Sequence, residues 1–314
     1  MAKYLLHRVY QTLILLLIVS LLSFLLISLM PTDPVYAQYG LDITVEEYAE
    51  YYHRMGLDKP IIIRYFNWLF NFLKGNFGTS YSYHKPVFEV IFAKLGTTLY
   101  LSILSMIISM PLGVLLGTIT AVKRGKAADT IITFISNTLI AVPQFVIAIV
   151  FLYFIAMKWK LLPPQGFTWP WDDFGKHIKQ LIMPLTCLTM GGIAGFCRQT
   201  RSSILEVLGQ DYVRTARAKG LKEIKIITKH VLNNGLIPIL TMVGGRLAGL
   251  IGGSMFVENV FNIPGMGNLM IKAVNSMDMP VIQALVLITA TVISIAYIIT
   301  DVLYVIVDPR ISLS

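Results

Sequence analysis

The chain has 314 residues, of which 55% are hydrophobic and 14% are charged, and its formal net charge is +9. Soluble domains carry roughly 25% charged residues, so this composition argues against an ordinary soluble protein. The positive charge alone could indicate nucleic-acid binding. However, the basic residues lie in the segments between long apolar runs, so we expect a lipid bilayer and no nucleic acid as the surroundings of this chain.

Six apolar runs divide the chain. A bilayer core about 30 Å thick needs about 20 apolar residues, and a run of that length must be helical because unpaired backbone groups are too costly in lipid. Five of the runs reach that length, and the fourth is marginal. The sequence therefore predicts an all-α, polytopic membrane protein with six transmembrane helices. The runs are Val9–Met30, Thr97–Val122, Thr130–Met157, Gln180–Cys197, Val231–Val257 and Met279–Thr300.

The basic residues predict the orientation. If the N-terminus is inside, the inside segments hold 14 Lys and Arg in 55 residues, and the outside segments hold 11 in about 110. Basic residues concentrate on the cytoplasmic side, so we expect both termini in the cytoplasm. The first run could instead be a cleaved signal peptide, but its 22 residues exceed the 7–15 of a signal core.

The runs divide the chain into four parts. We expect a cytoplasmic N-terminus with the first span in residues 1–30, an external helical segment in 31–96, a core of five spans in 97–308 with an internal loop at 198–234, and a cytoplasmic tail in 309–314.

Local signals predict helices in the external segment. Thr44 and Glu47 fit a capping box, and Gly56 would close the helix that they open. Pro60 suits the first turn of a second helix that ends near Gly75. This second helix is rich in aromatic residues, so we expect it at the membrane interface.

Prolines and closely spaced small residues within the runs predict kinked helices that pack closely. The prolines are Pro111, Pro143 and Pro184, and the small residues are Gly113 with Gly117, Gly191 with Gly195, and Gly245 with Gly249 and Gly253.

The internal loop carries a short helix. Residues 209–211 break the preceding helix, Asp211 can cap the next one, and Gly220 ends it. Ala216 would give this helix a small face. A following helix would place Lys222, Lys225 and Lys229 on one stripe and Ile224, Ile227 and Val231 on another. The spacing fits docking to a partner protein and attraction of a basic loop to anionic headgroups equally well.

The loop resembles the conserved cytoplasmic loop of ABC-importer permeases, in the version of the dipeptide, oligopeptide and nickel importers. The similarity rests on 211–221 and covers nearly the whole chain. Further matching segments are Pro31-Thr32-Asp33-Pro34, Gly56-Leu57-Asp58-Lys59-Pro60, Gly75-Asn76-Phe77-Gly78-Thr79-Ser80, Pro143-Gln144-Phe145, Pro264-Gly265-Met266-Gly267, Asp278-Met279-Pro280 and Asp308-Pro309-Arg310.

This resemblance implies a type I ABC-importer permease fold with an extra external helical segment after the first span, in a bacterial or archaeal cytoplasmic membrane. It implies that the chain forms half of a translocation pore with a homologous second permease subunit. Two ABC ATPase subunits, which bind ATP and Mg, and an extracytoplasmic substrate-binding protein would complete the importer. Oligopeptides or dipeptides are the expected cargo, and nickel or a metal chelate is the alternative.

The resemblance also assigns residues. The ATPase-coupling residues would be Asp211, Tyr212, Arg214, Thr215, Ala216, Arg217, Lys219 and Gly220. The external mouth would include Glu258, Pro264, Gly265, Gly267 and Asp278.

Two other classes of protein are weaker alternatives. A secondary transporter usually has more intramembrane acids, and Asp301, near the cytoplasmic end of the sixth span, is the only acid expected in a span. An intramembrane enzyme would need catalytic or metal-binding groups within a span, and the sequence shows no such set. The phosphate-binding pattern Gly-x-x-x-x-Gly-Lys-Ser/Thr is also missing. We therefore expect no catalytic residues, metal or cofactor in this chain.

Arg246 is the only basic residue within an apolar run, near the middle of the fifth span. A charge at that depth should face protein or water. One hypothesis gives it a structural partner, Asp301. The other places it in a translocation cavity, where Gly244, Gly245 and Gly249 leave room for an anionic group of the cargo.

Overall fold

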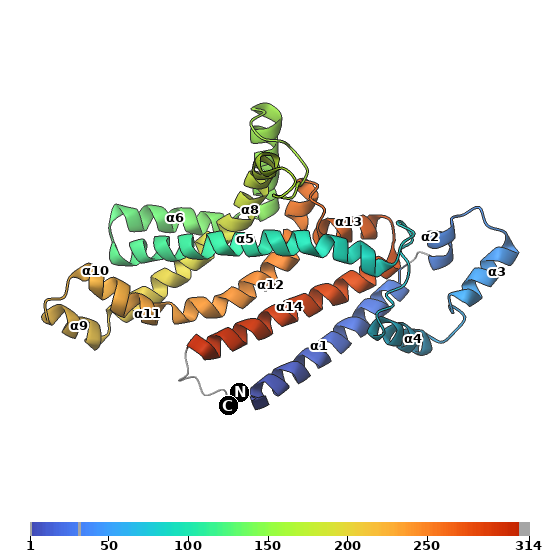
Figure 1. The fold of residues 1–314 in the computed structure, drawn as a ribbon, viewed down its shortest axis with the longest axis horizontal. Helices are drawn as coiled ribbons and strands as arrows, with labels where there is room; N and C mark the ends of the chain where they lie inside the picture. Colours follow the sequence, from blue (N-terminus) through green and yellow to red (C-terminus); the bar gives the residue numbers. More distant parts are fainter. Residues whose placement is uncertain (1, 31–32, 308–314) are drawn as a thin grey trace. The chain divides into compact units, whose positions relative to one another are not determined.

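The computed structural model describes residues 2–30 and 33–307. These residues are helical almost throughout (Figure 1), and the described part of the chain contains no strand, only an isolated bridge between Thr79 and Pro86. The chain divides into two compact units. The first comprises Met1–Thr98 and Pro264–Ser294, and the second comprises Leu99–Ile263 and Ile295–Ser314.

The first unit holds the external segment. Its elements are α1 (Ala2–Ser28), α2 (Pro34–Tyr39), α3 (Val45–Arg54), α4 (Ile61–Leu73), the start of α5 (Val87–Val122), α13 (Met266–Asn275) and the start of α14 (Met279–Val307).

The predicted caps of the external segment are confirmed. The Thr44 hydroxyl accepts a hydrogen bond from the Glu47 backbone, and the Glu47 carboxylate accepts one from the Thr44 backbone. Gly56 follows α3 with φ +67°, and Gly75 follows α4 with φ +83°. Only a residue without a Cβ adopts this left-handed conformation readily, so the two glycines end these helices as the sequence predicts.

The aromatic helix α4 packs against α1, the first predicted span. The hydroxyl groups of Ser20 and Tyr65 are 2.8 Å apart and hydrogen-bonded. The rings of Phe24 and Tyr65 meet edge to face at 5.5 Å, and Trp68 lies 5.6 Å from Phe24. Aromatic contacts of this kind add to the free energy of burial. They therefore anchor the external segment on the transmembrane helix that precedes it.

The second unit is a helical bundle. It holds the rest of α5, α6 (Ala127–Ala141), α7 (Gln144–Phe151), the π-helix η1 (Leu152–Lys158), α8 (Phe174–Leu208), α9 (Asp211–Ala218), α10 (Glu223–Lys225), the π-helix η2 (Ile226–Val231), α11 (Leu232–Gly235), α12 (Ile237–Val260) and the end of α14.

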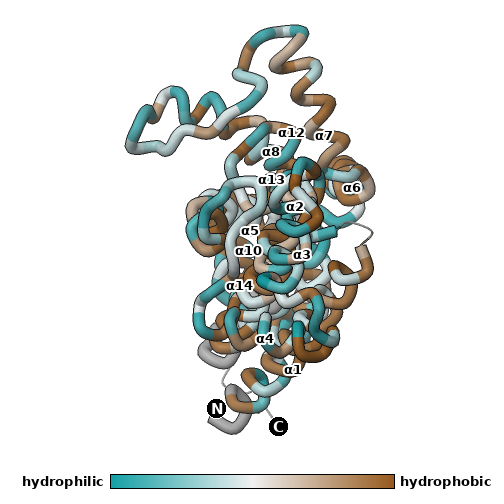
Figure 2. The backbone as a smooth tube through the Cα atoms, turned by 90° about the vertical axis from the view of Figure 1, so that its right-hand side faces the viewer, coloured by the Kyte–Doolittle hydropathy of each residue, from teal (hydrophilic) through white to brown (hydrophobic). Residues whose placement is uncertain are grey.

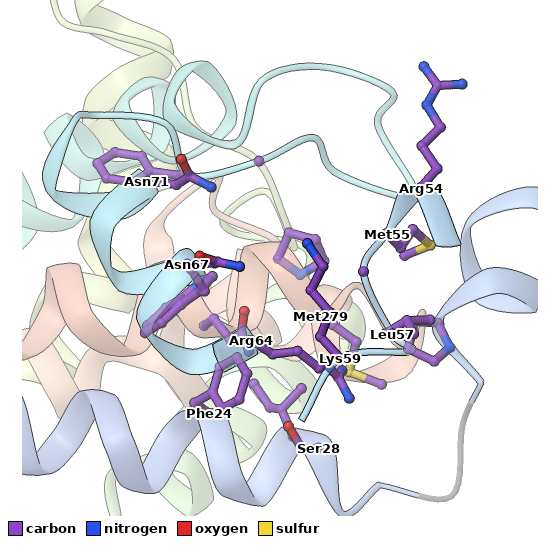
Figure 3. Close-up of a pocket in the computed structure, with 18 of the residues that line it drawn as sticks. Phe24, Ser28, Arg54, Met55, Leu57, Lys59, Arg64, Asn67, Asn71 and Met279 are labelled. Carbon is purple, nitrogen blue, oxygen red and sulfur yellow. The ribbon is translucent and has the colours of Figure 1, made fainter. Parts of the chain in front are cut away.

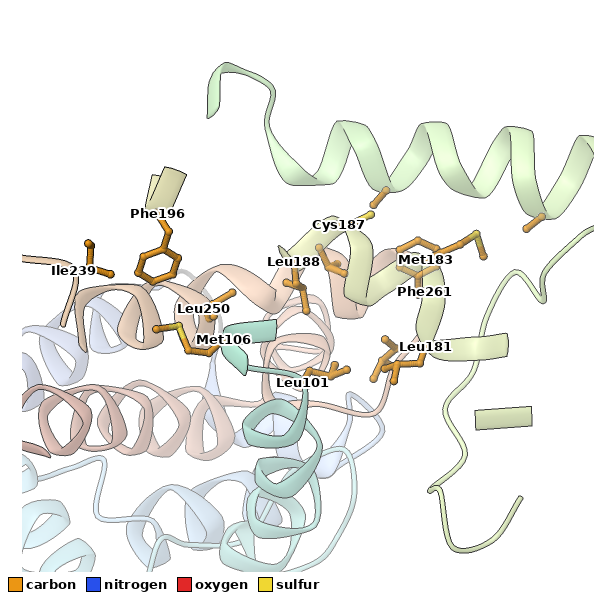
Figure 4. Close-up of a cluster of buried hydrophobic side chains, with 14 residues drawn as sticks. Leu101, Met106, Leu181, Met183, Cys187, Leu188, Phe196, Ile239, Leu250 and Phe261 are labelled. Carbon is orange, nitrogen blue, oxygen red and sulfur yellow. The ribbon is translucent and has the colours of Figure 1, made fainter. Parts of the chain in front are cut away.

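The core of the second unit lies between α5, α8 and α12. Leu101, Leu188 and Ile239 belong to its buried hydrophobic cluster (Figure 4). Glycines let α5 approach α8 closely. A Cβ on Gly113 would clash with the Phe196 side chain, and one on Gly117 would lie 2.6 Å from the Thr200 side chain. The predicted small-residue packing is thus confirmed for Gly113 and Gly117.

Four described helices are long and apolar enough to cross a membrane, and a fifth span results if α6 and the α7–η1 pair are counted together. Figure 2 shows the hydrophobic colour of α7, which is part of this bent pair. The predicted count of six stays a prediction. The fifth predicted run lies in α12, in which the side chains of Ile237, Leu240 and Thr241 are outside the described part.

Two predicted helix boundaries are wrong. The third run is not one helix, because α6 ends at Ala141 and the chain turns by 96° before α7 begins at Gln144. Pro143 lies at this turn, so the predicted kink is a complete break, since proline cannot donate the next helical hydrogen bond. The second run does not begin near Thr97. It continues a helix that starts at Val87, within the segment 31–96 that we expected to be external.

Candidate functional site

The first candidate site is the short helix α9. We call residues 209–235, with the ends of α5 and α8 that pack on them, the α9 module. α8 ends at Leu208, α9 begins at Asp211, and Gly220 follows it with φ +72°. One detail differs from the prediction. Gln210 is the N-cap and makes no side-chain hydrogen bond, whereas Asp211 lies in the first turn. Its exposed carboxylate is 3.6 Å from the Arg214 guanidinium.

The α9 module has its own hydrophobic core. Val213 and Ala216 point inward and pack with Ile204, Ile226 and Val231. Ala216 therefore directs the small face of this helix inward. Its methyl group is 8% exposed because the short helix must bury one side against the rest of the module.

The helix after Gly220 is also irregular. It passes from α10 into the π-helix η2, in which hydrogen bonds join residues five apart. This changes the register of the apolar stripe. Ile224 is 67% exposed and Ile226 is fully buried, although the regular helical period predicted Ile224 on the buried stripe. Ile227 and Val231 are buried as predicted.

The outward face of α9 is polar. Tyr212, Arg214, Thr215 and Lys219 are exposed. Arg217 is paired across the Gly220 turn, with its Nη2 2.7 Å from Oε1 of Glu223 and its Nε 3.2 Å from Oε2. This pair holds the pKa of the Glu223 carboxyl below its ordinary value. The α9 module therefore presents a preformed helix of mixed polarity on a fixed base.

An ion pair that the sequence reasoning missed fixes the base of this module. Arg201 in α8 donates two hydrogen bonds to Asp129 at the start of α6, at 2.8 and 2.9 Å. The backbone of Gly125 and the hydroxyl of Thr133 also donate to Asp129. The side chain of Asp129 is 9% exposed, so all four donors are needed to stabilise its charge. The two partners are 72 residues apart, and no local sequence pattern links them.

The second candidate site surrounds Arg246 in α12. Its Nε and Nη2 atoms are buried and have no hydrogen-bond partner in the described part of the chain. A Cβ on Gly191 would lie 3.4 Å from Nη2 of Arg246 and 3.4 Å from Nε2 of Gln144, and one on Gly192 would lie 3.2 Å from Nη2. The guanidinium therefore rests against the backbone of α8, beside the start of α7.

The room for cargo at Gly244, Gly245 and Gly249 stays a prediction. Gly191 and Gly192 leave room for the guanidinium, whereas Gly244 packs against Thr300. Gly245 and Gly249 are exposed, and a Cβ on Gly249 would meet nothing within 4 Å. The side chain of Asp301, the predicted structural partner, lies outside the described part of the chain.

Helix α5 of the same unit also carries buried polar groups. The hydroxyl oxygens of Ser102, Ser105 and Ser109 on α5 are buried without a hydrogen-bond partner in the described part of the chain. Ser109 also lies beside Gly192, because a Cβ there would be 2.7 Å from the Ser109 side chain. Buried polar groups normally have partners, so three such hydroxyl groups on one helix are unusual for a helix bundle.

The predicted mouth residues are mostly buried. Glu258 is fully buried and accepts a hydrogen bond from Ser254 at 2.9 Å. In the first unit, Asp278 is fully buried and accepts hydrogen bonds from the Ser80 hydroxyl and from the backbone of Tyr81 and Ser82. Asp278 therefore fastens the loop before α5 to the start of α14.

The remaining mouth residues lie at the start of α13. Gly265 is its N-cap, Gly267 is buried in its first turn, and Pro264 precedes both. In this structure these residues form the start of α13 and the turn before it. Their place at an external mouth stays a prediction.

Two sequence families match the chain. The family described as binding-protein-dependent transport system inner membrane component matches residues 113–313, and the N-terminal family of the same membrane components matches residues 1–102. Curated relatives match along the whole length. The oligopeptide transport system permease protein AppB of Bacillus subtilis is 35% identical over 314 residues, which is 99% of both chains. The dipeptide transport system permease protein DppB of Lactococcus lactis subsp. cremoris is 35% identical over 314 residues, which is 100% of both chains.

A solved structure shares the fold. A chain of the MetNI methionine ABC transporter, in inward-facing conformations, matches with a TM-score of 0.56 and 16% sequence identity. The match covers 70% of this chain and 97% of that one. At this identity the match confirms the predicted all-α importer-permease fold and nothing about cargo.

Proposed function

Since the chain belongs to the family of inner membrane components of binding-protein-dependent transport systems, and is the permease subunit of an ATP-driven importer, we propose that its cargo is an oligopeptide or a dipeptide. The observation that carries this proposal is the similarity to oligopeptide and dipeptide permeases along 99–100% of both chains. Nickel and metal chelates remain the alternative cargo.

Transport by the reconstituted importer tests the cargo. Proteoliposomes would contain this chain, its second permease and the ATPase subunits, with the binding protein outside and ATP inside. We expect ATP-dependent uptake of labelled dipeptides or oligopeptides that disappears when the binding protein is omitted. Uptake of labelled nickel with no uptake of any peptide would overturn the proposal.

The assembly follows from the same reading. The chain forms half of the pore with a homologous second permease, two ATPase subunits bind ATP and Mg, and an extracytoplasmic binding protein delivers the cargo. This chain hydrolyses no ATP itself. Both of its termini are cytoplasmic, which agrees with the higher density of Lys and Arg in the segments placed inside.

The outward face of α9 is the contact with the ATPase in this proposal. Its support is the fixed base beneath α9 and the exposed Tyr212, Arg214, Thr215 and Lys219. A photoreactive crosslinker on Thr215→Cys should capture the ATPase in assembled importer. Leu41→Cys is the matched control, because Leu41 is 80% exposed in the external segment. Equal capture from both positions would contradict the assignment.

Arg246 belongs to the translocation path in this proposal, together with Gly245 and Gly249. Its support is the buried Nε and Nη2 atoms of Arg246, which have no hydrogen-bond partner in the described part of the chain and lie next to the equally unpartnered Ser109 hydroxyl. A peptide carboxylate would satisfy the guanidinium with charge-assisted hydrogen bonds. The same group would not be satisfied by an uncharged cargo end, so Arg246 would favour peptides with a free C-terminus.

A further inference from the structure

The first unit contains a cavity of about 860 Å³ (Figure 3). Its walls come from the end of α1, the turn after α3, the length of α4 and the start of α14. The proposed transport function uses none of these residues. The volume is large enough for a small molecule or the polar end of a larger one.

Basic side chains outnumber acidic ones among the residues that line this cavity. Arg54, Lys59, Arg64 and Lys74 line it, and none of them forms an ion pair in the described part of the chain. Figure 3 shows Arg64 and Lys59 within the cavity, whereas Arg54 points away from it. Like charges that gather without a counter-ion raise the local positive potential and attract an anion.

The single carboxylate among the lining residues is already occupied. Asp33 accepts a hydrogen bond from the Val35 backbone at 2.8 Å and another from the Tyr48 hydroxyl at 2.6 Å. Asp33 therefore caps α2 and binds α3, and it forms no ion pair with a cation of the cavity in the described part of the chain.

Neutral donors add to the charge. Asn67 and Asn71 on α4 and Tyr81 in the following loop line the cavity. Burial, with a smaller contribution from Asp278, raises the pKa of Tyr81 to about 12. The phenol therefore keeps its proton at any physiological pH and can donate a hydrogen bond to an anion.

The cavity lies at the ends of two apolar helix segments. The apolar part of α1 ends at Ser28 and the apolar part of α14 begins at Met279, and both residues line the cavity. Phe24 and Trp68 form an apolar wall beside them. Basic side chains and aromatic rings in one cavity match the boundary at which a phospholipid changes from phosphate to acyl chain.

We propose that this cavity binds the phosphate headgroup of an anionic phospholipid in the leaflet that surrounds the external segment. Arg64 and Lys59 contact the phosphate, and Phe24 and Trp68 contact the start of the acyl chains. Arg suits this task because its planar guanidinium can bind two phosphate oxygens at once. The bound lipid fixes α4 and the turn after α3 against the first and last spans.

Lipid retention by the assembled importer tests the proposal. The complex would be purified from nanodiscs of equal phosphatidylglycerol and phosphatidylcholine, and the retained lipid would be measured by native mass spectrometry. We expect preferential retention of phosphatidylglycerol. The double variant Lys59→Gln/Arg64→Gln should retain about tenfold less of it, since each cation near an anionic surface contributes to binding.

Arg54→Gln is the matched control, because it removes a cation of the same cavity that points away from its centre. It should retain phosphatidylglycerol as the parent does, and Arg64→Lys should retain more than Arg64→Gln. Equal retention of the two lipids by the parent, or equal loss in Arg54→Gln and the double variant, would overturn the proposal. Stabilisation of the delipidated complex by millimolar glycerol phosphate, equal to that by phosphatidylglycerol, would assign the cavity to a soluble phosphate compound instead.

Discussion

The α9 module and the surroundings of Arg246 both contain basic side chains, but they stabilise them in opposite ways. In the α9 module, Arg217 pairs with Glu223, and Arg201 beneath it pairs with Asp129. Around Arg246, the Nε and Nη2 atoms of the guanidinium and the Ser109 hydroxyl are buried without a partner in the described part of the chain. The first region is complete within this chain. The second has polar groups that a cargo or another subunit can satisfy.

This difference separates a structural use of charge from a functional one. In the proposed coupling role, a rigid base would let α9 transmit a movement of the ATPase to α8, because loose side chains would not absorb it. An unsatisfied guanidinium costs stability, and that cost is reduced when a carboxylate reaches it. The predictions below test whether the two regions differ in this way, from the largest expected effect to the smallest.

A charge in the core of the α9 module should have the largest effect. Ala216→Asp would bury a carboxylate among Val213, Ile226 and Val231 without a partner, at a cost of about 3–5 kcal/mol. We expect ATP-dependent transport to be lost while the spans stay folded. The measurements are uptake in proteoliposomes and amide exchange of the module.

Ala218→Asp is its control, because Ala218 lies in the same helix and is exposed. This variant should assemble and keep the α9 module folded. If Ala216→Asp transports as well as Ala218→Asp, the module does not depend on its buried face.

Removal of the ion pair under the module should have the next largest effect. Arg201→Ala leaves the Asp129 carboxylate with only the Gly125 and Thr133 donors. Removing one partner of a fully buried pair costs 3–5 kcal/mol, and we expect about 2 kcal/mol because Arg201 is 29% exposed.

The measurement is thermal unfolding of the purified importer, with Arg198→Ala as the control on the same helix. Arg198 is exposed and forms no ion pair in the described part of the chain. Equal melting temperatures of the two variants would show that the base of the α9 module does not depend on this pair.

Local rules made much of the fold predictable from the sequence. The capping box at Thr44 and the positive φ of Gly56 and Gly220 each depend on a few neighbouring residues. The apolar runs also predicted the long helices, because the thickness of the bilayer sets the length of a span.

The structure differs from the sequence-based predictions where an irregular helix or contacts between residues far apart in the sequence determine the packing. The exposure of Ile224 and the burial of Ile226 follow from the π-helix η2, which the regular helical period of the sequence does not indicate. The Asp129–Arg201 pair joins residues from two helices, and neither partner stands out in the sequence. Arg246 was predicted as a functional residue because a charge in an apolar run is conspicuous by itself, but its contact with Gly191 and Gly192 of α8 was not predictable.

Substitution of Arg246 should alter selectivity more than stability. Arg246→Gln removes the charge but keeps hydrogen-bond donors beside Gly191 and Ser109. We expect the preference for a peptide with a free C-terminus over its amidated analogue to fall about tenfold, which corresponds to the loss of one charge-assisted hydrogen bond.

The measurement is competitive uptake of the two peptides, and Arg246→Lys should keep part of the preference because it keeps the charge. An unchanged preference in Arg246→Gln would give Arg246 a structural role, and it would remove the contrast with the α9 module.

The exposed pair of the α9 module should have the smallest effect. Arg217 and Glu223 are 44% and 52% exposed in their side chains, so solvent screens their attraction, and Arg217→Gln should cost about 0.5 kcal/mol. Because Arg217 lowers the pKa of Glu223, the pair stabilises the folded module above the ordinary pKa of a glutamate, about 4.3. This stabilisation is lost as the pH falls through the lowered pKa of the folded state. The melting temperatures of the parent and of Arg217→Gln should therefore differ slightly at pH 7 and converge in acid. Lys219→Gln is the control, because it removes an exposed cation that forms no ion pair in the described chain. Its melting temperature should show no such convergence with that of the parent. A difference between the parent and Arg217→Gln that grows in acid would mean that Arg217 acts through a group other than Glu223.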